Sequence, residues 1–301
     1  MIDYLYKMTV PWAKANKAQL LRNRILGRIA NYIYPFEYKS FSKNRDCVPN
    51  VIVSLTSFPA RIERLHLCIG SLLNQDIIPE RIILWLAESQ FPEKRIPLKL
   101  QELTNDLFEV RYCPDYKSYK KILPTIDKYK NKIIVTADDD VIYPTFWLSE
   151  LLNTASQYPD CIICHRASRI VFDEENKIGK YRDWVSLSPD FKGPSNELVA
   201  IGVGGILYPA GFFEGVDLDY DIIRLICPTA DDLWLKIIEL KKGTRIVKVK
   251  ENSTEWFTII DSQNEVLTKV NVLNGQNDIL LENLINYYHI DTSTMRDIDE
   301  S

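Results

Sequence analysis

Short apolar runs alternate with segments of helical spacing through residues 51–137. Aliphatic and β-branched side chains fill four runs of strand length, which is typical of buried strands. These runs are residues 51–55, 81–86, 108–112 and 132–137. Between them, apolar positions recur at helical spacing in residues 61–74, 98–107 and 124–130. Strands that alternate with helices predict an α/β fold with a doubly wound, mostly parallel sheet flanked by helices.

The second half of the chain is less regular. Residues 160–171 hold two apolar runs, and residues 183–198, rich in Pro, Ser, Asn and Asp, predict a long loop. Residues 199–209 predict an apolar strand that three glycines interrupt. Those glycines indicate either a bulged or edge strand, or backbone that lies close to a bound sugar. The remaining predicted elements are helices over 230–242 and 277–288 and a strand over 245–249.

Charge sets the N-terminal segment apart. Residues 1–46 hold nine Lys and Arg against three Asp and Glu, although the whole chain has a net charge of −4. Basic and apolar side chains mix there in the pattern of an amphipathic helix. The basic ones are Lys14, Lys17, Arg22, Arg24 and Arg28, and the apolar ones are Trp12, Leu20, Leu21, Ile25, Leu26 and Ile29. Such a helix either packs on the protein with its basic face in water, or contacts an anionic membrane surface.

These patterns divide the chain into three parts. We expect a basic amphipathic helical segment over residues 1–46, a catalytic domain over 47–250 and a C-terminal helical extension over 251–301. A chain of 301 residues with 46% hydrophobic and 26% charged residues has the composition of a globular enzyme. Its negative net charge gives no reason to expect nucleic acid as a partner.

Composition also bears on location. The sequence holds no apolar run of about 18 residues and no apolar signal segment at its N-terminus. We therefore expect a cytoplasmic protein, in peripheral contact with the inner face of the membrane if residues 1–46 bind lipid. Its six cysteines lie mostly in apolar segments, and we expect them to be reduced.

Three consecutive acids, Asp138, Asp139 and Asp140, directly follow the predicted strand 132–137. The carboxyl ends of strands are where open α/β sheets hold their ligands. Adjacent carboxylates repel one another, and their burial costs several kcal/mol unless a positive charge compensates. A divalent cation on a phosphorylated substrate would compensate, and oxygen ligands suit Mg²⁺ or Mn²⁺. The alternative interpretation is a solvated acidic turn that caps the next helix.

A second acidic pair, Asp231 and Asp232, begins the predicted helix 230–242. Thr229 and Asp232 match the capping-box pattern, so these acids have a structural interpretation as helix caps. Their catalytic interpretation is different. A transferase that activates a sugar hydroxyl needs a carboxylate base beside its donor site.

Further candidates follow the predicted strands. Thr56 and Arg61 come after the first strand, a position suited to a nucleotide, and Glu88 follows the second, where it could accept hydrogen bonds from a base. Lys121 either binds a diphosphate or belongs to a solvated basic face. Asp139 is assigned to the same nucleotide site.

Together these residues resemble the GT-A glycosyltransferases, in particular the bacterial family 2-like enzymes of capsule, O-antigen and lipopolysaccharide synthesis. The resemblance covers about residues 51–249. Residues 51–56 resemble the first nucleotide-binding strand, and residues 138–140 resemble the D-x-D metal motif. Residues 230–232 resemble the catalytic Glu-Asp pair, with Asp in place of Glu. The resemblance implies that Asp138 and Asp140 contact Mn²⁺ or Mg²⁺, and that Asp232 is the base.

The function implied is a metal-dependent glycosyltransferase. It would move a sugar, with inversion, from a nucleotide-sugar donor to a hydroxyl of a glycan or lipid-linked acceptor in surface polysaccharide synthesis. Two alternatives remain. One is a sugar-1-phosphate nucleotidyltransferase, which usually has a glycine-rich basic loop after its first strand; residues 56–61 contain no glycine. The other is a non-catalytic carbohydrate-binding protein of the same fold.

Overall fold

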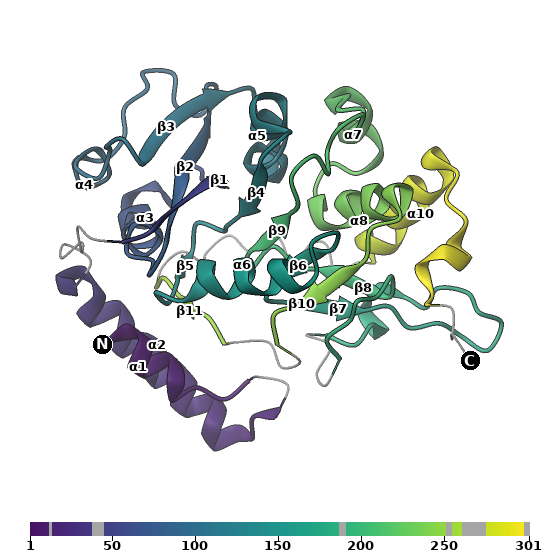
Figure 1. The fold of residues 1–301 in the computed structure, drawn as a ribbon, viewed down its shortest axis with the longest axis horizontal. Coiled ribbons are helices and arrows are strands. Elements are labelled where there is room, and N and C mark those ends of the chain that lie inside the picture. Colours follow the sequence, from purple (N-terminus) through teal and green to yellow (C-terminus); the bar gives the residue numbers. More distant parts are fainter. Residues whose placement is uncertain (12–13, 38–44, 187–190, 251–254, 261–274, 298–301) are drawn as a thin grey trace.

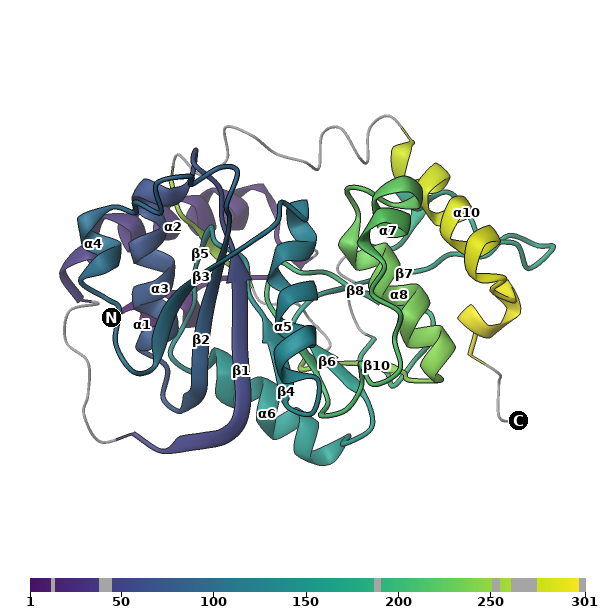
Figure 2. The ribbon, with the colours of Figure 1, turned by 90° about the horizontal axis from the view of Figure 1, so that it is seen from above.

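A seven-stranded sheet forms the centre of the protein (Figures 1 and 2). The computed structural model describes all residues except 12–13, 38–44, 187–190, 251–254, 261–274 and 298–301. The strands of the sheet follow the order β10-β6-β9-β4-β1-β2-β3. Their bounds are β1 (Cys47–Thr56), β2 (Ile78–Ala87), β3 (Phe108–Cys113), β4 (Ile133–Thr136), β6 (Ile162–Cys164), β9 (Ile206–Tyr208) and β10 (Ile246–Lys248).

Most of these strands run parallel. β1 pairs in parallel with both β2 and β4, β2 with β3, and β6 with β10. β9 is antiparallel to both of its neighbours, β4 and β6. The predicted class, a mostly parallel α/β sheet flanked by helices, is confirmed.

The strand order predicts a ligand-binding crevice beside β1. From β1 the chain proceeds outward through β2 and β3, and then returns to form β4 on the other side of β1. Open α/β sheets bind their ligands at such a reversal, outside the carboxyl ends of the two strands. Residues 57–61 follow β1 and residues 137–140 follow β4. The two segments therefore meet at the same edge of the sheet.

Helices cover both faces of the sheet (Figure 2). They are α3 (Leu65–Leu73), α4 (Leu98–Gln101), α5 (Leu123–Tyr129), α6 (Trp147–Gln157), α7 (Tyr220–Ile226), α8 (Asp231–Lys242) and α10 (Gln276–Tyr288). Every residue of α3 is buried. Side chains of β1 alternate between two cores, since Val51 and Val53 pack with α3 whereas Ile52 packs with Trp85. Burial on both faces explains the nearly continuous apolar runs of these strands.

Two predicted elements differ in the structure. The helix predicted over 98–107 ends at Gln101, because the Asn105 side chain accepts the backbone N–H groups of Leu107 and Phe108 and stabilises a turn. The strand predicted over 199–209 is instead two strands in different sheets. β8 (Leu198–Ala200) pairs with β7 (Ala167–Arg169), and β9 joins the central sheet. Gly204 and Gly205 turn the chain between them with φ of 119° and 92°.

The N-terminal segment forms α1 (Ile2–Lys7) and α2 (Lys17–Glu37), and Trp12 of the predicted pattern lies outside the described residues. Leu26, Ala30 and Tyr34 of α2 belong to the same core as the central sheet. The Asn31 side chain donates to the carbonyl of Thr258 at 2.8 Å. Thr258 lies in β11 (Phe257–Thr258), which pairs with β5 (Val141–Ile142). Both ends of the chain thus contribute to the region around the central sheet.

Figures 1 and 2 place α1 and α2 at the opposite end of the molecule from α10. Across the described ranges, no helix combines the length and the apolar character needed to cross a bilayer. All six cysteines are free.

Candidate functional site

The segments after β1 and β4 are joined by charged hydrogen bonds. Asp139 is buried and accepts from the Ser57 hydroxyl at 2.5 Å and from Arg61 Nη1 at 2.6 Å. Arg61 Nη1 also lies 3.2 Å from Asp140 Oδ2. Arg61 and Asp139, both predicted to contact a nucleotide, therefore contact each other and fix the floor of the crevice. Thr56 donates its hydroxyl to the Trp85 carbonyl at 2.8 Å.

Lys121 joins the two acidic motifs. Its Nζ lies 3.1 Å from Asp138 Oδ1 and 3.1 Å from Asp231 Oδ2. The Lys121 side chain is buried, and its backbone carbonyl accepts the Ser54 hydroxyl of β1 at 2.6 Å. The structure thus brings together three residues that the sequence singled out at widely separated positions.

Gly202 lies between the same motifs. Its backbone N–H donates to Asp232 Oδ2 at 3.3 Å. A Cβ atom at this position would stand 2.8 Å from Lys121 Nζ, 3.4 Å from Asp232 Oδ1 and 3.5 Å from Asp138 Oδ1. Lys121 Nζ and the carboxylates of Asp138 and Asp232 therefore all lie close to Gly202, and the lysine leaves too little room for a Cβ atom there.

The acids that begin α8 have tertiary partners. The N-cap of α8 is Ala230, which has no side-chain oxygen to cap the helix. Asp231 is directed to Lys121, and Asp232 accepts the backbone N–H of Gly202. Both acids therefore contact residues far from them in the sequence.

Burial and crowding of acids shift the pKa values of this cluster. Burial, and then the neighbouring Asp231, raise the pKa of Asp232 to about 8. Burial, and then Asp138 and Asp139, raise the pKa of Asp140 to about 7. Burial opposes the charge of Lys121, but the surrounding carboxylates raise its pKa well above the ordinary value. Perturbed groups that share a crevice indicate a functional site.

Negative charge is concentrated in the cluster. The carboxylates are those of Asp138, Asp139, Asp140, Asp231 and Asp232, and among the described residues Arg61 and Lys121 form ion pairs with members of this set. Asp232 Oδ1 is buried and has no hydrogen-bond partner among the described residues. An acceptor oxygen left unpaired in a buried position is costly unless a ligand completes it.

The cluster also fits a divalent cation in part. Carboxylate oxygens are the right donors for Mg²⁺ or Mn²⁺, and the concentration of negative charge favours a cation. Within the described segments, however, no three Asp, Glu, His or Cys side chains converge into a complete metal site. Asp138 and Asp140 would therefore hold a metal only together with phosphate oxygens of a substrate and water, which is the usual arrangement for Mg²⁺.

Some residues near the cluster carried weaker signals in the sequence. Glu88 lies exposed after β2, at the same edge of the sheet. The Tyr143 hydroxyl accepts the backbone N–H of Asp138 at 2.9 Å. Burial, and then Asp232, raise the pKa of Tyr181 to about 12. Nothing in the local pattern around Tyr181 predicts that approach.

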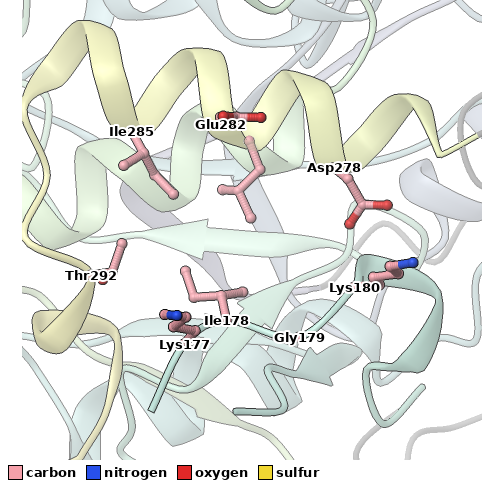
Figure 3. A pocket seen from close by; sticks show the side chains of 9 residues that line it. Lys177, Ile178, Gly179, Lys180, Asp278, Glu282, Ile285 and Thr292 are labelled. Atoms are coloured by element: carbon pink, nitrogen blue, oxygen red, sulfur yellow. The ribbon is translucent and has the colours of Figure 1, made fainter. Parts of the chain in front are cut away.

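A hollow of about 440 Å³ lies elsewhere, between α10 and residues 177–180 (Figure 3). Figure 3 shows the side chains of Asp278 and Ile285 of α10 extending toward this segment. Asp278 accepts the backbone N–H of Tyr181 at 2.7 Å. The described lining contains none of the predicted site residues, so this hollow is separate from the carboxylate cluster.

No protein-family model matches the chain, and no curated protein matches it. The solved structures that are similar to it at low identity include the following two. One is a 4-diphosphocytidyl-2C-methyl-D-erythritol synthase, with 13% identity, 80% of this chain and 100% of that chain covered, and a TM-score of 0.39. The other is a CMP:2-keto-3-deoxy-manno-octonic acid synthetase complexed with CTP. Its identity is 10%, the match covers 67% of this chain and 88% of that chain, and the TM-score is 0.39. The predicted glycosyltransferase family is not confirmed by these comparisons.

Proposed function

We propose that the chain is a transferase of nucleotide-linked sugars, which moves the sugar to a hydroxyl of a glycan or lipid-linked acceptor. One observation carries this proposal. Asp232 Oδ1 is buried and without a hydrogen-bond partner in the described chain, and it lies close to Gly202, as Asp138 Oδ1 does. A carboxylate in that position can accept the proton of an attacking hydroxyl.

The donor would bind over the carboxyl ends of β1 and β4. Asp138 and Asp140 would hold Mg²⁺ or Mn²⁺ together with the donor's diphosphate. When bound, such a cation supplies positive charge to the departing phosphate oxygens. Lys121 adds a fixed positive charge beside Asp138 and bridges Asp138 and Asp231. Arg61 and Asp139 hold the loops that carry these groups.

The reaction would be a single displacement. The acceptor oxygen attacks the anomeric carbon, the bond to the nucleoside diphosphate breaks, and the acceptor proton passes to Asp232 Oδ1. A pKa of about 8 matches a general base that works near neutral pH. Attack by the acceptor itself, without a covalent sugar-enzyme intermediate, inverts the anomeric configuration.

The second candidate is a sugar-1-phosphate nucleotidyltransferase. The names of the two compared structures contain cytidine nucleotides and favour this class of reaction, although a TM-score of 0.39 is too low to transfer an activity. The site favours the first candidate. A sugar phosphate is already an anionic nucleophile and needs no base such as Asp232. In addition, the basic residue after β1, Arg61, is paired with Asp139 and Asp140.

Two assays distinguish the candidates. The purified protein is incubated with UDP-, GDP- and CMP-sugars and Mn²⁺, and released nucleotide is measured with and without saccharide acceptors. In parallel, it is incubated with each nucleoside triphosphate and sugar 1-phosphates, and pyrophosphate is measured. Asp232→Asn is the site variant, and Asp106→Asn, at an exposed turn, is the matched control.

We expect nucleotide release that Asp232→Asn removes and Asp106→Asn preserves. Pyrophosphate release with the same dependence on the site variant would support the nucleotidyltransferase. Binding of saccharides without turnover in either assay would support the carbohydrate-binding alternative and contradict the proposal.

A further inference from the structure

Helix α2 exposes an apolar stripe on the side that faces away from the core. Leu21, Ile25, Ile29, Tyr32 and Phe36 are 58%, 49%, 42%, 77% and 77% exposed. At 100° per residue these positions fall within an arc of about 80° on the helix. Folded proteins rarely leave such a contiguous apolar surface in water unless it contacts something else.

The stripe is distinct from the buried face of the same helix. Leu26, Ala30 and Tyr34 pack into the central core, and Asn31 bonds to Thr258 and Ile260. The helix is therefore held in place by its inner side. Its outer apolar residues are not needed for that packing.

The exposed stripe continues at the end of α2. The N-terminal amine of Met1 lies 3.4 Å from Glu37 Oε1, which brings Met1 to the same end of the helix as Phe36. Met1 is exposed as well. The aromatic rings of Tyr32 and Phe36 lie 6.4 Å apart between their centroids. Amphipathic helices that lie in a membrane interface carry aromatic and aliphatic residues of this kind.

Basic side chains border the stripe on both sides. On a helical wheel, Lys17, Arg24 and Arg28 fall along one side and Arg22 along the other, and all four are exposed. The one acidic residue of α2 is Glu37, at its last position. Long basic side chains at the edges of an apolar face can place their charges among lipid headgroups while their methylene groups lie against the apolar layer.

We propose that this face of α2 binds an anionic lipid surface, with the helix axis parallel to the membrane plane. The basic side chains on both sides of the apolar stripe favour an anionic lipid surface over other partners. A second copy of the chain would set the arginines of one α2 against those of the other, with one glutamate per helix to compensate. Anionic headgroups supply the missing negative charge along the whole helix.

Binding would place the carboxylate cluster at a fixed distance from the membrane. Asn31 of α2 accepts the backbone N–H of Ile260, and the neighbouring Ile259 donates its N–H to the Asp140 carbonyl at 2.8 Å. A hydrogen-bonded route of few residues thus connects the lipid-binding helix to the acidic triplet. The inference concerns this surface alone and does not depend on the proposed reaction.

Vesicle flotation with the full-length chain tests the proposal. Vesicles of phosphatidylcholine are compared with vesicles that also contain phosphatidylglycerol, at low and at high salt. One double variant, Ile25→Ser with Ile29→Ser, removes apolar area, and another, Arg24→Gln with Arg28→Gln, removes charge. The matched controls are Leu225→Ser and Arg95→Gln, which change an exposed apolar and an exposed basic residue on other elements. Circular dichroism melting confirms that each variant is folded.

We expect flotation with anionic vesicles, little with neutral ones, and weaker binding at high salt. Loss of two arginines should weaken binding roughly thirtyfold, the serine variant should also bind poorly, and both controls should bind like wild type. Absence of binding, or equal binding to both kinds of vesicle, would overturn the proposal. A dimer that the serine variant dissociates, without vesicle binding, would assign the face to a second copy instead.

Discussion

The Asp232 carboxylate accepts a hydrogen bond from the backbone N–H of Gly202, at 3.3 Å, across 30 residues of the chain. This contact turns the carboxylate toward the carboxyl end of β4, where Asp138 lies. The other oxygen of Asp232 is buried and unpaired among the described residues. The start of α8 and the backbone N–H of Gly202 together therefore hold the unpaired oxygen of Asp232 near Asp138.

Gly202→Ala should reduce turnover at least about tenfold with little change in melting temperature. The new Cβ would stand 2.8 Å from Lys121 Nζ, so the lysine side chain must move away from Asp138 and Asp231. Because the displaced atom is the end of a flexible side chain, the fold should tolerate the change. Steady-state kinetics and thermal melting measure the two effects.

Gly27→Ala is the matched control for that variant. Gly27 lies inside α2, and a Cβ atom there would meet the Phe257 side chain at 3.6 Å, which is an ordinary van der Waals distance. Replacing a helical glycine by alanine typically stabilises by up to about 1 kcal/mol, and we expect unchanged turnover. Equal turnover in the two variants would show that the space beside Gly202 is not used.

The pKa of Asp232, raised to about 8 by burial and then by Asp231, predicts a pH dependence of rate. A general base acts when it is deprotonated, so kcat/KM should rise ~tenfold per pH unit below the pKa and level off above it. Initial rates with one donor over pH 5.5 to 9 test this. A rate that falls across the same range would contradict a base at this position.

The same shift predicts how stability depends on pH. The pKa of Asp232 is higher in the folded protein than its ordinary value of 3.8, so between these values the folded state binds more protons than the unfolded state. Its contribution to stability is present at low pH and is lost as the pH rises toward 8. The melting temperature of Asp232→Asn minus that of wild type should thus be larger at pH 8 than at pH 5. Parallel melting curves for the two proteins would contradict the shift.

We expect turnover to depend on a divalent metal held by the acidic triplet, residues 138–140. EDTA should abolish turnover, and Mn²⁺ or Mg²⁺ should restore it, because Asp138 and Asp140 would bind the cation together with the donor. Asp140→Ala should remove activity at any metal concentration tested, while Asp106→Asn should respond like wild type. Full activity of Asp140→Ala in excess EDTA would refute this role.

The sequence predicted the framework of this site because the framework depends on local pattern. The strand before Asp138 and the helix that begins at Asp231 follow from apolar periodicity, and strand ends in a parallel sheet meet at one edge. The side chains that pair with these acids could not be predicted from the local sequence pattern. Arg61 was expected to contact a nucleotide, and its ion pairs with Asp139 and Asp140 were not predicted. Such pairings connect residues far apart in the chain, and residue type alone does not select among them.

Local pattern also failed where side chains compete with the backbone. Asn105 ended the helix predicted over 98–107 through its own hydrogen bonds. At α8 the acids of the first turn have tertiary partners that the local pattern did not predict, since Asp231 pairs with Lys121 and Asp232 accepts the Gly202 N–H. Short polar side chains have several partners of similar energy within reach, and the folded surroundings decide which one is used.

Asp232→Asn is the most direct test of the proposed base. The amide oxygen of Asn can still accept the Gly202 N–H, so we expect a melting temperature within a few degrees of wild type and retained donor affinity. The amide cannot take a proton from the acceptor hydroxyl. Removal of a general base typically costs ~10²–10⁴-fold in rate, so turnover should fall at least about a hundredfold.

Asp231→Asn should have a smaller effect on rate, because Asp231 acts through Lys121. Its carboxylate lies 3.1 Å from Lys121 Nζ, and its loss leaves Asp138 as the partner of that lysine. Isothermal titration with a donor separates binding from turnover in both variants, and Asp106→Asn again serves as the control. The reverse ranking of the two variants would assign the base to Asp231. A large loss of stability with normal turnover in the folded fraction of Asp232→Asn would instead make the Gly202 contact purely structural, since the rate would then not depend on a charge at this position.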